Sequence, residues 1–486
     1  MPQLDDPQLL RDTLYIAGEW RRGANDRTLP VTNPATGETI AQVSLASRAE
    51  TTAAIEAADN ALAAWSALPA KGRAAILRRW YELIVAHVDD LAKILTAEQG
   101  KPLAEARGEI LYGAAFFEWY AEEAKRVYGE TIPAPDTGRR LMVLRQPIGV
   151  CAAITPWNFP MAMIPRKAAP ALAAGCTMVL KPASATPLSA LALAELADRA
   201  GVPAGVFQVL PGKASEVGDE LITHPTVRKV TFTGSTEVGR ELMAKASATI
   251  KKLSLELGGN APVLVFDDAD LDAAIAGAMF TKFRNMGQTC VCANRIYVQA
   301  GIYDRFVAAL ADAVNALRVG PGIEEGVEQG PLIDADAVTK VRSHIDDAVQ
   351  HGARIVAGGK PHALGGTFFE PTVLADAGPG MRIAHEETFG PVAPVFRFTD
   401  EAEAVRMAND TEFGLAAYLF TRDNARIWRV GEALEFGVLG VNTGNTSYEG
   451  APFGGLKASG LGREGSRHGI DEFLEIKYMC IAEIGT

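Results

Sequence analysis

Cys290 is the residue of this sequence whose type and setting best suit a nucleophile. It lies in FRNMGQTCVCANR, where the polar residues Gln288 and Thr289 precede it. A catalytic thiol must be at least partly exposed and its thiolate stabilised by nearby donors, whereas a structural cysteine normally lies within an apolar run. The alternative is a small packing residue, which is the usual role of a cysteine. Local spacing leaves both interpretations open.

Two polar residues elsewhere in the chain could support such a thiol. Glu256 lies on the polar face of the expected strand KKLSLELGGN, which ends at Gly258 and Gly259. A carboxylate beside glycines that allow close backbone approach suits a general base, with an exposed ion pair as the alternative. Asn158 in ITPWNFP has an amide that could share an oxyanion with the backbone N–H of Cys290. A turn formed by Asn-Phe-Pro explains that segment equally well.

The segment FTGSTEVG is a candidate for binding phosphate. A strand is expected to run into a helix there, and free amides at a helix N-terminus favour an anion near Gly234 and Ser235. The segment is not GxGxxG, because Gly239 is the next glycine. A helix cap formed by Ser235 or Thr236 is the alternative interpretation.

Cys292 does not point to a metal site. No nearby histidine or cysteine completes a ligand set, and the 7 histidines are scattered, so no metal is expected. We interpret Cys292 as a packing residue, with the further hypothesis that it resolves an oxidised Cys290. The 5 cysteines are odd in number and unevenly spaced, which argues against a disulfide scaffold.

The elements that would position these residues alternate between helices and strands. Apolar residues recur at helical spacing from about 48 to 124, and Pro/Gly-punctuated extended runs follow over 131–150. From Gly149 onward, β-branched runs alternate with Ala-rich helices, which is typical of βαβ units and a parallel sheet. A second α/β set runs from about 261 to 441, with a helix expected over 271–285, a strand over 295–299 and a helix over 303–317.

Three expected strands end near Lys181, Leu210 and Thr233. Ligands of open parallel sheets bind beyond the carboxyl ends of the strands. One edge of the sheet is therefore expected to carry Trp157, Lys181, Pro211 and Gly234. Between the first two strands, TPLSALALAELADRAG predicts a helix that Thr186 caps, with Pro187 in its first turn and Gly201 at its end.

Length and charge limit the class of protein. A chain of 486 residues is too long for one compact core and predicts two or three domains. A net charge of −12 argues against nucleic acid and membrane surfaces as partners. The longest apolar stretch, 168–180, is interrupted by Pro170 and Gly175 and is too short to span a bilayer. The acidic N-terminus MPQLDDPQLLRD does not resemble a secretory signal, so a cytoplasmic location is expected.

Several motifs together carry a resemblance to a known family. The segments TPWNFP, LKPA, FTGST, LELGGN, GQTC, EETFGPV and PFGGLKASGLGREG occur in the order found in the aldehyde dehydrogenase superfamily. The similarity runs from IAGEW near the start to EIKYM near the end. Within that superfamily the chain most resembles NADP-dependent succinate-semialdehyde dehydrogenases, through KFRNMGQTCVCANR and GCTMVLKPAS.

The resemblance implies a role for each candidate residue. Cys290 becomes the nucleophile, Glu256 the general base and Asn158 the oxyanion donor. Cofactor positions of the family fall on Thr155, Pro156, Trp157, Lys181, Ser184, Gly234, Ser235, Glu387 and Phe389, with Glu387 for a ribose hydroxyl and Phe389 beside the nicotinamide. Ser184 stands where NAD-preferring relatives often carry an acid, which would repel a 2′-phosphate. NADP is therefore the expected cofactor, with NAD as a second one.

The same resemblance implies a small aldehyde as substrate. Arg166, Arg284 and Ser447 fall on positions that hold a distal carboxylate, and an arginine fork suits a carboxylate. Ion pairs at the surface or between domains are the alternative for both arginines. The loop NTGNTSYEGAPFGG is more polar than expected for this group, and Pro165 replaces a usual threonine. Succinic semialdehyde is the first choice; glutaric semialdehyde, or another carboxylated or small aliphatic aldehyde, is the alternative.

The fold implied is α/β, the aldehyde dehydrogenase fold. It comprises a Rossmann-like cofactor domain (1–131 and 149–258), an α/β catalytic domain (259–470) and a strand-exchanging oligomerisation arm (132–148 and 471–486). A homo-oligomer, dimer or tetramer, is expected. Two rival functions are a thiol esterase, which needs no cofactor, and a homologue that only binds; the cofactor motifs argue against the first and the retained Cys290, Glu256 and Asn158 against the second.

Overall fold

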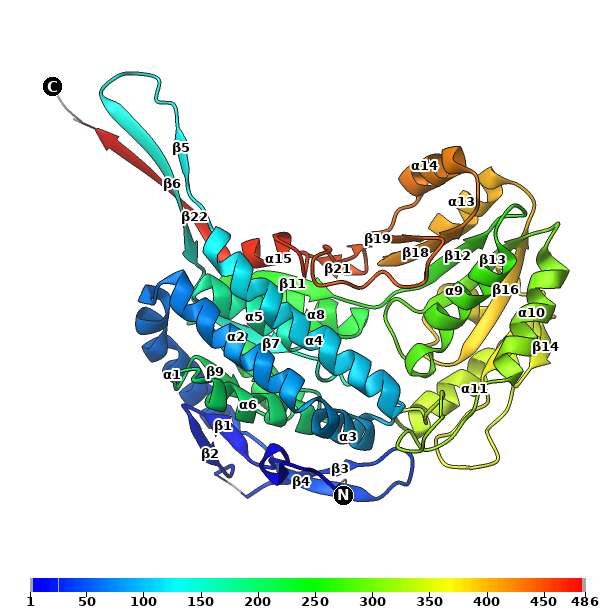
Figure 1. Cartoon of the computed structure of the whole chain (residues 1–486), viewed down its shortest axis with the longest axis horizontal. Coiled ribbons are helices and arrows are strands. Elements are labelled where there is room, and N and C mark those ends of the chain that lie inside the picture. Colours follow the sequence, from blue (N-terminus) through cyan, green and yellow to red (C-terminus); the bar gives the residue numbers. More distant parts are fainter. Residues whose placement is uncertain (1–2, 25, 483–486) are drawn as a thin grey trace.

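The computed structural model describes residues 3–24 and 26–482 of the chain (Figure 1). Two sheets, each flanked by helices, form the body, and a narrow arm of strands extends away from it. The first sheet draws mainly on the N-terminal half of the chain and the second on the C-terminal half. The predicted α/β architecture is therefore present in both halves.

The first sheet has the strand order β2-β1-β9-β8-β7-β10-β11-β21. Its parallel centre consists of β9 (Phe207–Val209), β8 (Thr177–Lys181), β7 (Val150–Ile154), β10 (Val227–Thr233) and β11 (Lys252–Glu256). Antiparallel pairs complete its two sides through β1 (Leu14–Ile16), β2 (Glu19–Arg21) and β21 (Gly460–Leu461). Ile154 is in register with Lys181 and Phe232, and Thr233 with Glu256, so these strands end at one edge, as predicted.

A helical layer covers this sheet, as the spacing over 48–124 predicted (Figure 1). It contains α1 (Arg48–Ala67), α2 (Ala70–Ala86), α3 (Val88–Gln99) and α4 (Leu103–Glu123). Ser47 and Glu50 form a capping box at the start of α1, each side chain binding the other residue's backbone N–H. The ring of Trp80 packs against those of Phe117 and Phe207, which joins α2 to α4 and to the sheet. The crossovers add α5 (Pro165–Ala174), α6 (Leu188–Ala200), α7 (Asp219–Thr223) and α8 (Thr236–Ala246).

The start of α6 corrects one prediction. Thr186 does not cap this helix, and its hydroxyl has no hydrogen-bond partner among the described residues. Instead, the Glu98 carboxylate of α3 accepts hydrogen bonds from the backbone N–H groups of Leu188 and Ser189, both at 2.8 Å. A buried carboxylate at this N-terminus satisfies two free amides where a threonine would satisfy one. The other end is as predicted, because Gly201 has the left-handed φ of 84°.

The second sheet has the order β14-β15-β16-β13-β12-β18-β19. Its strands are β14 (Arg354–Ala357), β15 (Thr372–Ala375), β16 (Val392–Phe398), β13 (Ala293–Gln299), β12 (Ala261–Val265), β18 (Ala416–Phe420) and β19 (Val438–Val441). The helices of this half are α9 (Leu271–Phe283), α10 (Tyr303–Asn315), α11 (Ala335–Gln350), α12 (Arg382–His385), α13 (Glu401–Asn409) and α14 (Asn424–Ala433). The predicted second α/β set is present.

The arm is a three-stranded sheet in the order β22-β6-β5. It joins β5 (Glu130–Ile132) and β6 (Arg139–Pro147) to β22 (Leu474–Ala482), which follows the short α15 (His468–Asp471). β22 and β6 are antiparallel, with Leu474 in register with Pro147 and Ala482 with Arg139. Figure 1 shows this sheet projecting from the body. The last residues of the predicted arm, 483–486, lie outside the described part of the chain.

Two small antiparallel pairs complete the fold: the hairpin of β3 (Thr28–Thr32) and β4 (Thr39–Ser44), and the pair of β17 (Phe413–Gly414) with the distant β20 (Leu456–Lys457). Over residues 3–24 and 26–482, no helix has both the length and the apolar composition that crossing a membrane requires.

Candidate active site

A cavity of about 980 Å³ lies between the two halves of the body. Eleven of the predicted site residues line it: Pro156, Trp157, Asn158, Arg166, Gly234, Ser235, Arg284, Cys290, Glu387, Phe389 and Ser447. They come from segments far apart in the sequence, including the end of β10, the loop after α9 and the loop after β19. The cavity therefore brings together the predicted nucleophile and the residues expected on both sides of it.

Cys290 lies half-buried in the wall of this cavity. The chain reaches it through Asn285 and Met286, whose left-handed φ values of 52° and 59° redirect the backbone after α9. Gly259 lies so close that a Cβ there would be 2.3 Å from the carbonyl oxygen of Cys290. Burial raises the pKa of the Cys290 thiol to about 12; Arg166 opposes this shift and Glu387 adds to it. The resting thiol is therefore protonated at neutral pH.

Glu256 lies at the end of β11, just behind the cavity wall formed by Thr233 and Leu257. It is buried, and neither carboxylate oxygen has a hydrogen-bond partner within the described residues. Burial raises its pKa well above the usual value, and the Glu464 carboxylate adds to that shift while Arg166 and Lys167 oppose it. A buried, unpartnered carboxylate near the thiol has the proton affinity that a general base needs.

Asn158 is held at both ends. Its side-chain Nδ2 donates to the carbonyl oxygen of Gln288 at 2.9 Å, which leaves one amide hydrogen free. Its own carbonyl oxygen accepts from Lys101 Nζ at 2.8 Å and from Asn285 Nδ2 at 2.9 Å. The amide is thus fixed to the loop that carries Cys290, where it can donate to a developing oxyanion.

The other end of the cavity has the features of a cofactor site. The rings of Trp157 and Phe389 meet edge to face at 5.5 Å between centroids. Glu387 Oε1 accepts from the backbone N–H of Gly259 at 2.9 Å, and burial raises its pKa to about 7. Gly258 keeps the space beside Glu387 open, because a Cβ on residue 258 would lie 3.0 Å from Glu387 Oε2.

Ser235 caps α8, its hydroxyl accepting from Val238 N at 3.4 Å, so the helix-cap interpretation of FTGST is correct. Gly234 and Ser235 also line the cavity at this helix N-terminus. Capping occupies one acceptor of the hydroxyl and does not close the space in front of the helix. Both interpretations of this segment are therefore compatible.

Three predicted cofactor residues, Thr155, Lys181 and Ser184, do not line the cavity, and neither does the rim candidate Pro211. Thr155 N donates to the carbonyl oxygen of Lys181 at 3.1 Å, which places both at the carboxyl edge of the first sheet. Lys181 is buried, and burial lowers the pKa of its amine to about 8. Ser184 is exposed in the loop that follows β8.

The two predicted arginines stand in different surroundings. Arg166 is buried and forms an ion pair with Glu464 at 2.8 Å, with its guanidinium 4.1 Å from the centroid of the Phe453 ring. Arg284 lies between the rings of Phe159 and Phe280, at 5.3 Å and 5.1 Å from their centroids. Among the described carboxylates none forms an ion pair with Arg284. Its guanidinium is therefore available to a ligand anion, with the Glu105 carboxyl as an opposite charge that acts on it.

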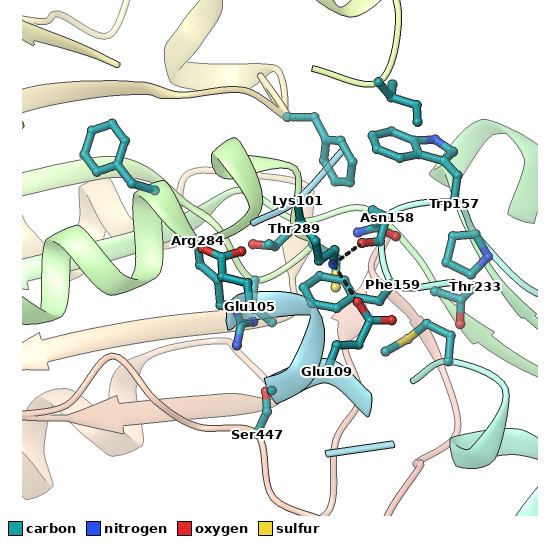
Figure 2. Close-up of a pocket in the computed structure, with 18 of the residues that line it drawn as sticks. Lys101, Glu105, Glu109, Trp157, Asn158, Phe159, Thr233, Arg284, Thr289 and Ser447 are labelled. Carbon is teal, nitrogen blue, oxygen red and sulfur yellow. Dashed lines mark hydrogen bonds and ion pairs between the residues drawn. The ribbon is translucent and has the colours of Figure 1, made fainter. Parts of the chain in front are cut away.

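Figure 2 shows the cavity wall with Arg284, Glu105 and Ser447 toward one end and Trp157 and Thr233 toward the other. One face of α4 contributes a group that sequence reasoning missed: Lys101 just before the helix, and Glu105, Glu109 and Tyr112 within it. These residues recur at helical spacing in GKPLAEARGEILYG, which is the signal that could have marked a polar stripe.

Cys292 is buried, and its Sγ lies 3.1 Å from Lys282 Nζ. That Cys292 forms a disulfide with an oxidised Cys290 remains a hypothesis. No cluster of metal-binding side chains occurs in the part of the chain that the structure describes.

Comparisons with known proteins match almost the whole chain. The family model described as "Aldehyde dehydrogenase family" matches residues 20–479. A glutarate-semialdehyde dehydrogenase of Pseudomonas aeruginosa is 64% identical over 99% of this chain and 100% of its own. An NADP-linked succinate-semialdehyde dehydrogenase of Escherichia coli is 62% identical over 99% of each chain. The crystal structure of an NADP-dependent enzyme of E. coli superposes with a TM-score of 0.98, at 62% identity, over 99% of this chain and 100% of that one.

Proposed function

The chain belongs to the aldehyde dehydrogenase family and has its fold, as its motifs predicted, and we propose that it oxidises succinic semialdehyde to succinate with NADP. The observation that carries this proposal is the cavity. It holds a half-buried cysteine, a fixed amide donor and, toward one end, an arginine that forms no ion pair within the described residues. Such a site suits an aldehyde whose far end is an anion.

Cys290 begins the proposed reaction. Its thiolate attacks the aldehyde carbon, and the oxyanion of the resulting thiohemiacetal accepts hydrogen bonds from Asn158 Nδ2 and the Cys290 backbone N–H. A nicotinamide held beside Trp157 and Phe389 would supply the acceptor for the hydride of this carbon. Cys290 then carries a thioester. Because the thiol pKa is about 12 in the resting protein, the thiol must pass its proton to a base before attack.

Glu256 completes the reaction by activating water. A thioester is stable enough to need an activated nucleophile, and a carboxylate with a raised pKa is a stronger base than an exposed one. The unpartnered oxygens of Glu256 are free to bind that water or to take the proton of Cys290. The carboxyl is buried at the end of β11, beside Thr233 and Leu257 of the cavity wall.

NADP fits the residues of the opposite end. Trp157 and Phe389 form an aromatic wall for a planar ring, Glu387 offers acceptors for a ribose hydroxyl, and the N-terminus of α8 faces the same space. The exposed Ser184 places no carboxylate near a 2′-phosphate, and Lys181 at the end of β8 adds an amine. These features favour NADP, with NAD as a second cofactor.

Arg284, rather than Arg166, would bind the carboxylate of the substrate. Arg166 already shares its charge with Glu464, so a second anion there would compete with a buried ion pair. Arg284 is held between two rings without such a partner, and Ser447 lies in the same wall. Of the three positions that the resemblance implied for the carboxylate, we therefore retain Arg284 and Ser447. Glutaric semialdehyde is the second candidate, since a relative of 64% identity is named for it.

We also propose the domain division stated above: residues 1–131 and 149–258 bind the cofactor, 259–470 carry the nucleophile, and 132–148 with 471–486 form the arm. The first sheet and the arm support it. One detail refines it, because β21 (Gly460–Leu461) pairs with β11 of the first sheet although it falls within 259–470.

The test compares two aldehydes of similar length, succinic semialdehyde and butanal, by the absorbance of the reduced cofactor. Wild type should oxidise the acid with the higher kcat/KM. Arg284→Ala should lower kcat/KM for succinic semialdehyde about tenfold to hundredfold, because charge-assisted hydrogen bonds contribute about 1.5–3 kcal/mol, and should affect butanal much less. Arg354→Ala, which removes an exposed arginine paired with Asp376, is the matched control.

Equal losses with both aldehydes would show that Arg284 does not bind the carboxylate. A higher kcat/KM with glutaric than with succinic semialdehyde would reverse the order of the two substrates. Ester hydrolysis without any cofactor-dependent oxidation would favour the thiol esterase instead.

A further inference from the structure

Lys101 is a buried lysine in the wall of the cavity, although no step of the proposed reaction uses it. It lies between α3 and α4, and its Nζ donates to Asn158 O at 2.8 Å and to Glu109 Oε2 at 2.6 Å (Figure 2). The same ammonium group stands 3.9 Å from the centroid of the Phe159 ring. The ammonium group thus contacts both the Glu109 carboxylate and the segment that carries Asn158.

Glu109 extends this contact along the segment. While Oε2 pairs with Lys101, Oε1 accepts from the backbone N–H groups of Met161 and Ala162, both at 3.0 Å. The approach of α4 is close here, since a Cβ at Gly113 would lie 2.6 Å from Met161 Sδ. The lysine and the glutamate therefore bind the chain on both sides of Phe159, and leave the segment little freedom.

A second donor reaches the same carbonyl oxygen from the cysteine loop. Asn285 Nδ2 donates to Asn158 O at 2.9 Å and to Gln288 O at 3.2 Å, and Gln288 O also accepts from Asn158 Nδ2. Asn285 is fixed in turn, because Gln99 Nε2 donates to its Oδ1 at 3.0 Å. The backbone carbonyl and the side-chain amide of Asn158 are thus both anchored.

A buried lysine–glutamate pair does not by itself account for this arrangement. Removing two charges from water is unfavourable, and an apolar pair of similar volume is often at least as stable. What an apolar pair cannot supply is a donor to Asn158 O, and a fixed peptide plane sets the direction in which the side chain leaves its Cα. An oxyanion site is effective only when its donors are oriented in advance.

We propose that Lys101, held by Glu109, is a positioning residue that orients the Asn158 amide toward the oxyanion formed at Cys290. The inference rests on the proposed function, because it requires an oxyanion at that place. The oxyanion exists only after the thiol has attacked. Loss of the lysine should therefore reduce kcat and leave the binding of aldehyde and cofactor nearly unchanged.

The test is a double-mutant cycle of Lys101→Met and Asn158→Ala, with kcat and KM measured for succinic semialdehyde. Removing one oxyanion donor costs about 100-fold to 1,000-fold in kcat. We expect Lys101→Met to lower kcat about 10-fold to 100-fold with KM changed less than about threefold, and to lower it little further when Asn158 is already alanine. Additive losses in the double variant would overturn the inference.

Lys229→Met is the matched control, because Lys229 is another fully buried lysine beside a glutamate, with its Nζ 3.2 Å from Glu472 and 5.2 Å from the centroid of the Phe473 ring. It does not line the cavity, so its loss should change stability and not kcat. If both methionine variants lose kcat equally, Lys101 has only a structural role.

Asn285→Asp keeps the inference testable if Lys101→Met does not fold. Aspartate tolerates the left-handed backbone and retains the acceptor for Gln99, but it cannot donate to Asn158 O. It should reproduce the loss of kcat without disturbing the buried pair; an unchanged kcat would count against the inference. If wild type oxidises no aldehyde, both the proposed function and this inference are wrong. If wild type oxidises succinic semialdehyde and Lys101→Met leaves kcat unchanged, only the inference is wrong.

Discussion

Cys290 lies in the cavity wall, and burial raises the pKa of its thiol so that it is protonated at neutral pH. The carboxyls of Glu256 and Glu387 add to the high pKa of this thiol, and Arg166 and Arg284 oppose it. This balance can be shifted when a cofactor or substrate changes the charges around the site. The Cys290 thiol of the resting protein should therefore be far less reactive than a thiol with an ordinary pKa.

The alkylation of Cys290 should follow this ionisation. With a pKa of about 12 in the absence of ligands, the thiolate fraction should rise about tenfold for each pH unit between pH 7 and pH 9. The rate of iodoacetamide labelling should rise in the same proportion, measured by mass spectrometry of the peptide that contains Cys290. Cys292→Ser should show the same profile. A plateau below pH 8 would mean that the free protein already stabilises the thiolate.

Ser184 should decide the choice of cofactor. Ser184→Asp places a carboxylate in the exposed loop after β8. This carboxylate would repel the 2′-phosphate of NADP and would not repel the 2′-hydroxyl of NAD. KM for NADP should rise at least about tenfold, which is about 1.4 kcal/mol, with KM for NAD changed little. Thr32→Asp, an exposed position on β3, controls for added negative charge. An equal effect on both cofactors would remove Ser184 from the site.

Single residues also mark what the sequence could and could not predict. Short motifs were enough to select Cys290, Asn158 and Glu387 as site residues, because each lies in a segment whose turn is determined by its own sequence. The engagement of Arg166 by Glu464 could not be read from the sequence, since it joins residues that are far apart in the chain. Lys101 and Glu109 were missed for the same reason. Their spacing marks a helix face, and only the packing of α4 shows that this face meets Asn158.

At the scale of elements, the start of α6 shows how one side chain can replace a local cap. Glu98 of α3 serves two amides of α6 and is fully buried in doing so. Burial raises the pKa of its carboxyl to about 7, while the hydrogen bonds from Ser189 and Leu188 oppose that shift. The junction of α3 and α6 is therefore a place where pH and stability should be linked.

The raised pKa of Glu98 should make the free energy of unfolding depend on pH. Between its ordinary pKa of 4.5 and about 7, the folded state keeps a proton that the unfolded state has lost. The associated stability is present below pH 4.5 and is lost as the pH rises through 7, by at most about 1.4 kcal/mol for each unit. Wild type should thus lose stability relative to Glu98→Gln across this range, measured from urea midpoints at pH 5 and pH 7.5. Parallel profiles for the two proteins would contradict this.

Helix and strand placement was otherwise well predicted, because period and punctuation are local properties. The helices over 48–124 and the strands that end at Lys181 and Thr233 follow from spacing and from β-branched runs. The cap by Thr186 was wrong because the competing carboxylate comes from another helix. The addition of β21 to the first sheet could not be foreseen either, since a two-residue strand has no period.

At the scale of the whole molecule, the arm is the feature that most implies assembly. β22 and β5 are the outer strands of its sheet, and Ile476 and Tyr478 on β22 are 70% and 59% exposed. Open strand edges with large apolar side chains are surfaces that proteins usually cover. The expectation of a homo-oligomer stays a prediction, and this sheet is where it can be tested.

A charged arm should weaken that assembly. The double substitution Ile476→Glu and Tyr478→Glu puts two like charges on one face of β22 and should raise the dissociation constant at least about tenfold. Sedimentation velocity over a range of protein concentrations measures this. Trp428→Glu, which alters a residue that is 65% exposed on α14, is the control. An unchanged oligomeric state, or a monomeric wild type, would exclude the arm as the interface.

The arm also offers a place for a fluorescent reporter. The structure describes all five cysteines, and Cys480 on β22 is the exposed one, whereas Cys290 is half-buried and the other three are buried. Since the Cys290 thiol is protonated at neutral pH, a maleimide dye should attach at Cys480 first. The native chain thus carries its own attachment point on the outer strand of the arm, and the emission of that dye would report whether another chain lies beside it.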